Sequence, residues 1–414
     1  MPKLSRSRVA AAAAAAAMAL SLPGCGMRTG VAPGAAGVDA RTIKVGMLLD
    51  LSGPLAGSGK TVQQASKLAA EEINAAGGVC GRRLRLVTRD NGYDPQKAIT
   101  AYDDVKPEVL GFLNIYGSAV ISALRDKIEQ DGVLAGLTSF SSDLLGDRNL
   151  IVLGATYDVQ MINAVDWLVR RGSIRSGDTV GHIYLQGDFG ENSYKGSRAA
   201  AARLGLRLVG QQIKPTDADL TSQVNALRSA GARAVLIDAN SKQTASAASV
   251  MRATGFDVPI MGGVSTFGRS LLSTSAAAAL AGRYHKVSGL GSIGGTSEGA
   301  RALAAAWARR FGSVLPESDH GVVHAYVLTR LYAKIIGSTC GDLTRKGLLD
   351  ARSKITDFSV PGLLPAQNLA DPSAPTSRES QIQKIDPRGP AGLSVLEDFR
   401  ASGAAQAYQV EHAD

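Results

Sequence analysis

The chain has 414 residues, of which 45% are apolar and 20% are charged, and its formal net charge is +9. Acidic residues are interleaved with Lys and Arg, whereas a nucleic-acid surface needs a basic cluster, so no nucleic-acid partner is expected. A chain longer than about 300 residues exceeds what one hydrophobic core usually holds, so two domains are predicted.

The N-terminal segment has the pattern of an export signal. A basic start is followed by an apolar stretch, residues 9–22, that is too short for a permanent membrane span. The stretch leads into the tetrapeptide LPGC, which ends at Cys25 and resembles the lipobox of bacterial lipoproteins. This resemblance implies a signal peptide over residues 1–24 and a lipidated Cys25 that anchors the exported protein to the outer face of the cell membrane. An ordinary secretory signal with an incidental cysteine is the alternative.

The segment after the signal is predicted to be a tether. Residues 25–41 consist largely of Gly, Ala and Pro, which cannot build a core and are typical of a flexible linker. No later segment has 18 consecutive apolar residues, so no further membrane crossing is expected.

Two cysteines remain beyond the tether. Cys80 and Cys340 lie among Gly and polar residues, which is typical of turns rather than of a core. An even pair in an oxidising compartment favours a disulfide, and two buried free thiols are the alternative.

From Thr42 onward, short β-branched runs alternate with segments of helical periodicity. In the first half, strands are predicted at 42–49, 84–88, 109–115 and 133–138, and helices at 60–74, 95–105 and 119–129. After Tyr157 the alternation restarts, with helices at 159–170, 191–204, 220–229 and 244–254 and strands at 179–185, 207–213, 234–237, 258–261 and 284–288. Helices at 298–311 and 320–336 follow, and an irregular tail with a few strands is expected after residue 357.

This repeated β-α-β rhythm predicts an α/β fold of two doubly wound parallel-sheet lobes. Ligands of open α/β sheets bind beyond the carboxyl ends of the strands, so two lobes that face each other there form a cleft. Hinge closure of the lobes would enclose a small solute.

Several motifs in the first half carry a family likeness. The segments LSGPLAG from Leu51, EEINAAGGV from Glu71 and DNGYDP from Asp90 occur in the order and spacing of the Leu/Ile/Val-binding family of type I periplasmic binding proteins, which the chain resembles. GDFG from Gly187 resembles the binding loop of that family's second lobe, and residues 255–262 resemble its strand leading back to the cleft.

The resemblance implies the receptor of an ABC importer, with a small-molecule solute in the cleft and a permease and ATPase complex as partners. It implies a three-strand hinge, an N-terminal lobe of residues 42–156 and 288–345, and a C-terminal lobe of residues 157–287 and 346–414. A monomer is expected, with neither enzyme activity, cofactor nor metal. A ligand sensor for a signalling partner and an extracellular hydrolase are the alternatives.

In the family's amino-acid binders, the first lobe holds the ligand carboxylate. The matching positions are Ser118 with the adjoining Ala119, and the segment Phe140, Ser141 and Ser142. Hydroxyls and free N–H groups at a helix N-terminus suit an anion. The alternatives are an N-cap role for Ser118 and a turn role for Ser141 and Ser142.

The second lobe departs from the amino-acid binders. Phe189 keeps the family's aromatic residue, but Asn240 stands where a tyrosine is found and Val264 where the ammonium-pairing glutamate is found. Because an enclosed ammonium without a carboxylate is costly, branched-chain amino acids are not favoured. A carboxylate lacking an amino group, an amide or an aromatic acid suits Ser118, Phe189, Tyr116 and Asn240. The alternative places Phe189 and Tyr116 in the core.

Three further patterns do not support another activity. The GSGKT segment that starts at Gly57 lacks the leading glycine of a phosphate-binding loop. His320 and His324 are four residues apart but lack the glutamate of a zinc-protease motif, so they are predicted to be helix-surface or interlobe residues. No catalytic triad is suggested by the spacing of Ser, His and Asp.

Overall fold

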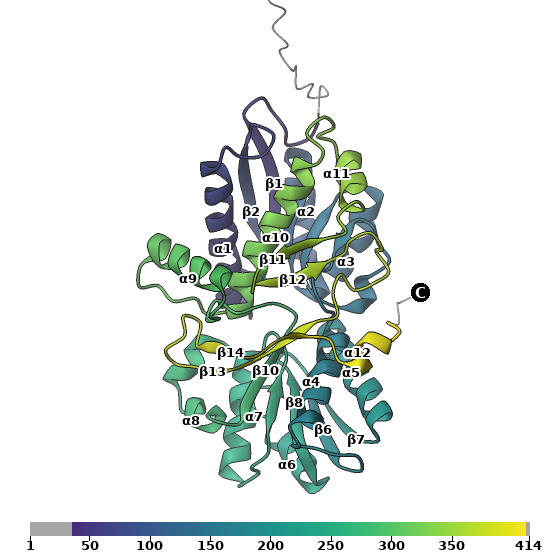
Figure 1. Cartoon of the computed structure of the whole chain (residues 1–414), viewed down its shortest axis with the longest axis vertical. Coiled ribbons are helices and arrows are strands. Elements are labelled where there is room, and N and C mark those ends of the chain that lie inside the picture. The colour runs from purple at the N-terminus through teal and green to yellow at the C-terminus, as the bar shows by residue number, and fades with distance from the viewer. Residues whose placement is uncertain (1–34, 411–414) are drawn as a thin grey trace, which may run out of the picture.

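The computed structural model describes residues 35–410, so the predicted signal peptide and Cys25 lie outside the described residues. Two α/β lobes lie one above the other along the longest axis of the molecule (Figure 1). The upper lobe in this view contains β1, and the lower lobe contains β6 to β8. The predicted fold class, two doubly wound lobes of an α/β protein, is therefore confirmed.

The first lobe is built on a five-stranded parallel sheet in the order β2-β1-β3-β4-β5. Its strands are β1 (Thr42–Leu49), β2 (Arg83–Asp90), β3 (Phe112–Tyr116), β4 (Ala135–Thr138) and β5 (Leu150–Ile151). Its helices are α1 (Ala56–Ala75), α2 (Pro95–Val105), α3 (Ser118–Gln130), α9 (Glu298–Phe311), α10 (Asp319–Gly337) and α11 (Arg345–Arg352), with 3₁₀ turns η1 (Lys106–Glu108) and η2 (Ser142–Leu144).

The second lobe has a seven-stranded sheet in the order β14-β13-β10-β9-β8-β6-β7, in which only β13 and β14 run antiparallel to their neighbours. Its strands are β6 (Thr179–Leu185), β7 (Arg207–Ile213), β8 (Ala232–Asp238), β9 (Ile260–Gly262), β10 (Tyr284–Ser288), β13 (Ser380–Ile385) and β14 (Leu393–Arg400). Its helices are α4 (Tyr157–Arg170), α5 (Asp188–Leu204), α6 (Thr221–Ser229), α7 (Ser241–Ala253), α8 (Ala276–Leu280) and α12 (Gly403–Ala407), with the 3₁₀ turn η3 (Arg269–Ser273).

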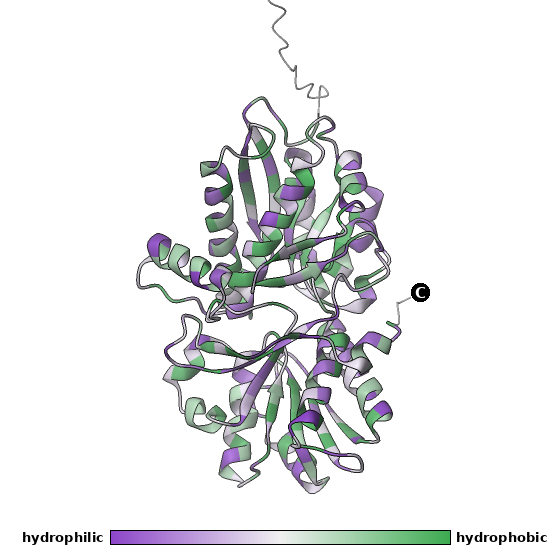
Figure 2. Ribbon diagram, viewed as in Figure 1, coloured by the Kyte–Doolittle hydropathy of each residue, from purple (hydrophilic) through white to green (hydrophobic). Residues whose placement is uncertain are grey.

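Apolar burial explains why these segments fold as they do. Buried residues fill β1 and β3, as expected for parallel strands covered on both faces. In Figure 2, apolar residues are frequent along the strands of both lobes, whereas polar residues are frequent on the outer helices. Helix α1 lays an apolar face that includes Val62, Ala65 and Leu68 into the same core as α10.

The chain crosses between the lobes three times, after β5, after β10 and after β12. The last crossing comes later in the chain than predicted: the second lobe was predicted to resume at residue 346, but the chain crosses only after β12. Helix α11 and the hairpin of β11 (Phe358–Val360) and β12 (Leu364–Gln367) contribute Leu348, Phe358 and Leu364 to the first-lobe core. Only β13, β14 and α12 of the tail join the second lobe, because their strands pair with β10.

A disulfide joins Cys80 and Cys340, whose Cα atoms are 5.4 Å apart, which confirms the predicted bridge. Cys80 lies in the turn between α1 and β2, and Cys340 follows the end of α10. Across residues 35–410, the structure contains no helix long and apolar enough to span a membrane.

Candidate ligand-binding site between the lobes

The candidate site lies at the carboxyl ends of the parallel strands, where the two lobes meet. The first lobe contributes the residues after β3 and β4, and the second lobe contributes the first turns of α4 and α5. Six buried or half-buried side chains gather there and are called the interlobe cluster below: Ser118, Ser139, Phe140, Tyr157, Phe189 and His320.

Three hydroxyl groups form the polar part of this cluster. The Ser118 and Ser139 hydroxyl oxygens are 2.7 Å apart and share a hydrogen bond. Both serines also form hydrogen bonds with the phenol of Tyr157, whose pKa burial raises to about 12. Gly117 occupies the N-cap position of α3, and the helix has no side-chain cap. The structure therefore does not support the alternative in which Ser118 merely caps this helix. Of the adjoining Ala119, which is exposed, only the backbone N–H could serve an anion, since its methyl side chain has no hydrogen-bond donor.

Aromatic rings form the apolar part of the cluster. Phe140 meets Tyr157 edge-on with ring centroids 5.6 Å apart, and Tyr157 meets Phe189 of the second lobe at 5.0 Å. His320 and His324 also contact Phe140, with ring centroids 4.9 and 5.1 Å from that of Phe140. Ring faces and edges suit an apolar ligand body.

The two histidines were predicted to be helix-surface or interlobe residues, and the surface interpretation is wrong. His320 is 6% exposed and His324 is fully buried. Burial lowers the pKa of His324 to about 3 and that of His320 well below its ordinary value, so both imidazoles are neutral. Nearly every residue of α10 is buried. Because histidine is polar, the sequence pattern did not indicate that His320 and His324 would be buried as well.

The remaining predicted residues have other partners. Tyr116 is buried, and its phenol forms a hydrogen bond with Ser58 at the start of α1. Ser141 accepts a hydrogen bond from the Asp143 N–H and caps η2, which is the turn role that was the alternative. Asn240 caps α7 in a reciprocal capping box with Gln243.

Ser142 ties the lobes together. Its hydroxyl donates to Asp158 Oδ2 of α4 at 2.8 Å and accepts from Asn192 Nδ2 of α5 at 2.5 Å. Burial raises the pKa of Asp158. Ser142 therefore holds a buried polar network between the lobes, which the sequence did not reveal.

Further polar contacts close the lobes at the periphery. Lys195 of α5 forms an ion pair with Asp143 at 2.7 Å. On another side, Glu317 accepts hydrogen bonds from the backbone N–H of Ser270 at 3.0 Å and from its hydroxyl at 2.6 Å. These contacts hold the lobes against each other around the interlobe cluster.

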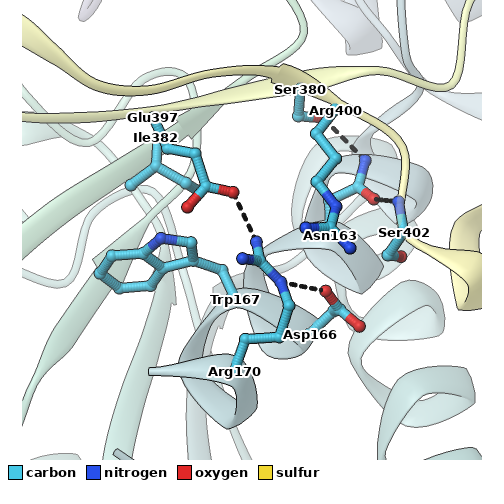
Figure 3. Close-up of a pocket in the computed structure, with 9 residues that line it drawn as sticks. All are labelled: Asn163, Asp166, Trp167, Arg170, Ser380, Ile382, Glu397, Arg400 and Ser402. Carbon is cyan, nitrogen blue, oxygen red and sulfur yellow. Dashed lines mark hydrogen bonds and ion pairs between the residues drawn. The ribbon is translucent and has the colours of Figure 1, made fainter. Parts of the chain in front are cut away.

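A separate small pocket lies inside the second lobe, between α4 and the β13–β14 strands (Figure 3). Its volume is about 10 Å³, which leaves room for about one water molecule. Arg170 in its wall already pairs with Asp166 at 2.9 Å and with Glu397 at 2.5 Å. This pocket is a structural ion-pair site rather than a ligand site. Among the described residues 35–410, no group of three His, Cys, Asp or Glu side chains is placed to hold a metal ion.

The fold defines a class of protein, namely two-lobed α/β proteins whose lobes are joined by three crossings, and the interlobe cluster is the candidate solute site. Residues 42–409 match the model of a family described as periplasmic binding protein. The chain belongs to this family, and its curated relatives include Leu/Ile/Val-binding proteins and their homologues. Members of this family bind solutes and are not classed as enzymes.

Individual relatives agree with this assignment. A Leu/Ile/Val-binding protein homologue of Brucella melitensis is 26% identical over 47% of this chain and 53% of its own length. The chain spans about half the length of the curated relatives it matches.

Solved structures cover more of the chain. A fatty acid ABC transporter substrate-binding protein from Thermomonospora curvata is 36% identical, covers 91% of this chain and 97% of its own, and superposes with a TM-score of 0.88. A branched-chain amino acid ABC transporter protein from Thermus thermophilus with bound valine superposes with a TM-score of 0.77 over 89% of this chain and 99% of its own. Its identity is 16%, so this second likeness shows the shared fold alone.

Proposed function

We propose that the protein is an extracytoplasmic receptor of an ABC importer that binds a small carboxylate with an apolar body between its lobes. The observation that carries this proposal is the interlobe cluster itself. It combines three hydroxyl groups, which can donate to a carboxylate, with aromatic rings from both lobes.

Two further considerations favour an acid without an amino group. Val264, which stands where the family's amino-acid binders have the ammonium-pairing glutamate, is buried and packs with the first-lobe core. The Thermomonospora curvata relative, which is described as a fatty acid ABC transporter substrate-binding protein, is similar over almost its whole length.

The exported chain is proposed to be held at the membrane through a lipidated Cys25. Lipid labelling that persists in a Cys25→Ser variant would contradict this anchor.

Thermal-shift screening of the purified mature protein tests the ligand class. We expect carboxylates with an apolar body to raise the melting temperature, with branched-chain amino acids giving a smaller shift, because a ligand bound only by the folded state stabilises it. Each stabilising compound should be recovered unchanged after incubation. Consumption of the compound would contradict a receptor, and stabilisation only by amino acids would contradict the ligand class.

A further inference from the structure

A buried lysine lies on β10, the strand after which the chain crosses to the first lobe. Lys286 belongs to β10, where it pairs with Gly262 of β9 and with Gln383 of β13. It is 1% exposed, although lysine is almost never fully buried without a partner. The chain leaves the second lobe two residues later, so Lys286 occupies the level of the sheet that faces the first lobe.

Within residues 35–410, the ammonium group of Lys286 has neither a hydrogen bond nor an ion pair. The charged group that influences it is Asp319, at the start of α10. Oxygen Oδ1 of Asp319 accepts from the Ser292 hydroxyl and from the Ile293 N–H, each at 2.9 Å, whereas the buried Oδ2 has no hydrogen-bond partner among residues 35–410. Burial lowers the pKa of Lys286 to about 8, which still leaves most of the ammonium charged at neutral pH.

His320 is a second unsatisfied group at the same place. Both of its ring nitrogens are buried and have no hydrogen-bond partner among the described residues. Burial is the main cause of the low pKa of His320, and the charge of Lys286 is the second cause. The ring of His320 also contacts Phe140 of the interlobe cluster. A neutral imidazole has one N–H donor and one acceptor, and leaving both unpaired in the interior is costly.

We propose that Lys286 supplies the positive charge, and His320 an N–H donor, that receive the carboxylate of the bound solute. This inference rests on the proposed function and deepens it by naming the group that selects an acid. A carboxylate has about four acceptor positions, so it can accept from the ammonium, from the imidazole N–H and from hydroxyl groups of the cluster. The family's serine positions offer hydrogen bonds without charge, whereas Lys286 distinguishes an acid from its neutral amide.

The test compares each acid with the primary amide of the same chain length. Butanoate, octanoate and hexadecanoate and their amides are titrated against the mature protein and its Lys286→Met variant by calorimetry. We expect the variant to lose about 10- to 100-fold in affinity for the acid that wild type binds, and to keep its affinity for the matching amide. Lys384→Met is the matched control, because Lys384 lies on the neighbouring strand β13 and is exposed. The control should bind as wild type does.

The acid-to-amide ratio is measured within one protein, so a general loss of stability does not imitate the expected result. An acid-to-amide affinity ratio that is unchanged in Lys286→Met would overturn the role of Lys286 but not the proposed receptor function. In that case the Lys286 ammonium would be hydrated rather than bound to the ligand. Wild-type protein that binds none of the acids would overturn the proposed function and this inference together.

A purely structural Lys286–Asp319 pair gives a different pattern. In that case Lys286→Met would lower the melting temperature of the unliganded protein, and adding Asp319→Asn would restore it. We expect no such loss, because no hydrogen bond or ion pair joins the Lys286 ammonium to Asp319 among residues 35–410, although their charges interact. If Lys286→Met does not fold, Lys286→Gln serves instead, since it keeps a donor and removes the charge. An acid-to-amide ratio in Lys286→Gln equal to that of wild type would contradict the proposal.

Discussion

Ser118 is the first residue of α3, but its hydroxyl does not cap the helix. Its hydrogen bonds go to Ser139 and Tyr157, so the side chain belongs to the interlobe cluster rather than to the stability of α3. The sequence indicated this position through the family resemblance, but it could not show that Ser139 and Tyr157 would join it.

Replacing Ser118 by Ala should weaken binding of the preferred acid by about 1 to 3 kcal/mol, because a donor to a charged group is removed. The melting temperature of the unliganded protein should change little. Calorimetric titration and a thermal melt measure the two quantities. Ser338→Ala, at the far end of α10, is the control and should leave binding unchanged. A destabilised unliganded protein with normal affinity would instead assign Ser118 to the scaffold.

The buried His324 should make the unliganded protein less stable in acid. Its pKa is about 3 when folded, because of burial, and about 6.5 when unfolded, so between these values the unfolded chain takes up a proton that the folded one does not. The contribution of His324 to the free energy of unfolding is therefore fully present above pH of about 6.5. It decreases as the pH drops toward 3, by up to ~1.4 kcal/mol per pH unit.

Urea unfolding of wild type and His324→Gln at pH 7, 5.5 and 4.5 measures this effect. The variant should show a weaker dependence on pH than wild type. The comparison between the two proteins is needed because burial raises the pKa of Asp158 and Asp238, which act in the opposite direction. Equal slopes in the two proteins would show that folding does not lower the pKa of His324.

At the scale of elements, α1 and α10 form a helix pair in the core of the first lobe. They pack along their lengths, and the disulfide joins the turn after α1 to the residues after α10. Helix α10 has 19 residues and is therefore about 28 Å long, so the bridge lies far from His320 at its first turn.

Removing the bridge with Cys80→Ser and Cys340→Ser together should lower the free energy of unfolding by about 2 to 5 kcal/mol, because it closes a loop between residues 260 positions apart. Ligand affinity should remain close to that of wild type, since the site is at the other end of α10. Urea unfolding and calorimetry measure the two effects. A large loss of affinity in a folded variant would show that the bridge also shapes the site.

Helix α1 also shows why element boundaries escape sequence analysis. The predicted helix began at Lys60, but it starts at Ala56. The first turn of the helix contains Gly57 and Gly59, and a Cβ at Gly59 would lie 1.7 Å from the carbonyl oxygen of Asp50. The glycine is required by this close approach to the end of β1, which is a tertiary contact.

At the scale of the whole molecule, contacts at the rim hold the lobes together. Glu317 in the first lobe binds Ser270 in the second. A ligand enclosed by both lobes binds the closed arrangement, so weakening this contact should lower the apparent affinity by shifting the population toward open molecules.

Glu317→Ala should therefore increase the radius of gyration of the unliganded protein and weaken acid binding by about tenfold or less, as expected for the loss of charged hydrogen bonds. Small-angle scattering and calorimetry measure these quantities. Glu298→Ala, an exposed residue at the start of α9, is the control. An unchanged radius together with unchanged affinity would show that the contact does not govern closure.

The amino-acid sequence by itself determined the two-lobed α/β architecture and the disulfide, because apolar periodicity and cysteine pairing are local or compositional signals. It also indicated Ser118, Phe140 and Phe189, which the fold brings close together. Only the tertiary structure showed that residues 346–369 pack on the first lobe, that His320 is buried against Phe140, and that Lys286 is buried on β10. The physical reason is that burial depends on which segments meet across three chain crossings, and a polar residue in a helix or strand pattern carries no signal of what will cover it.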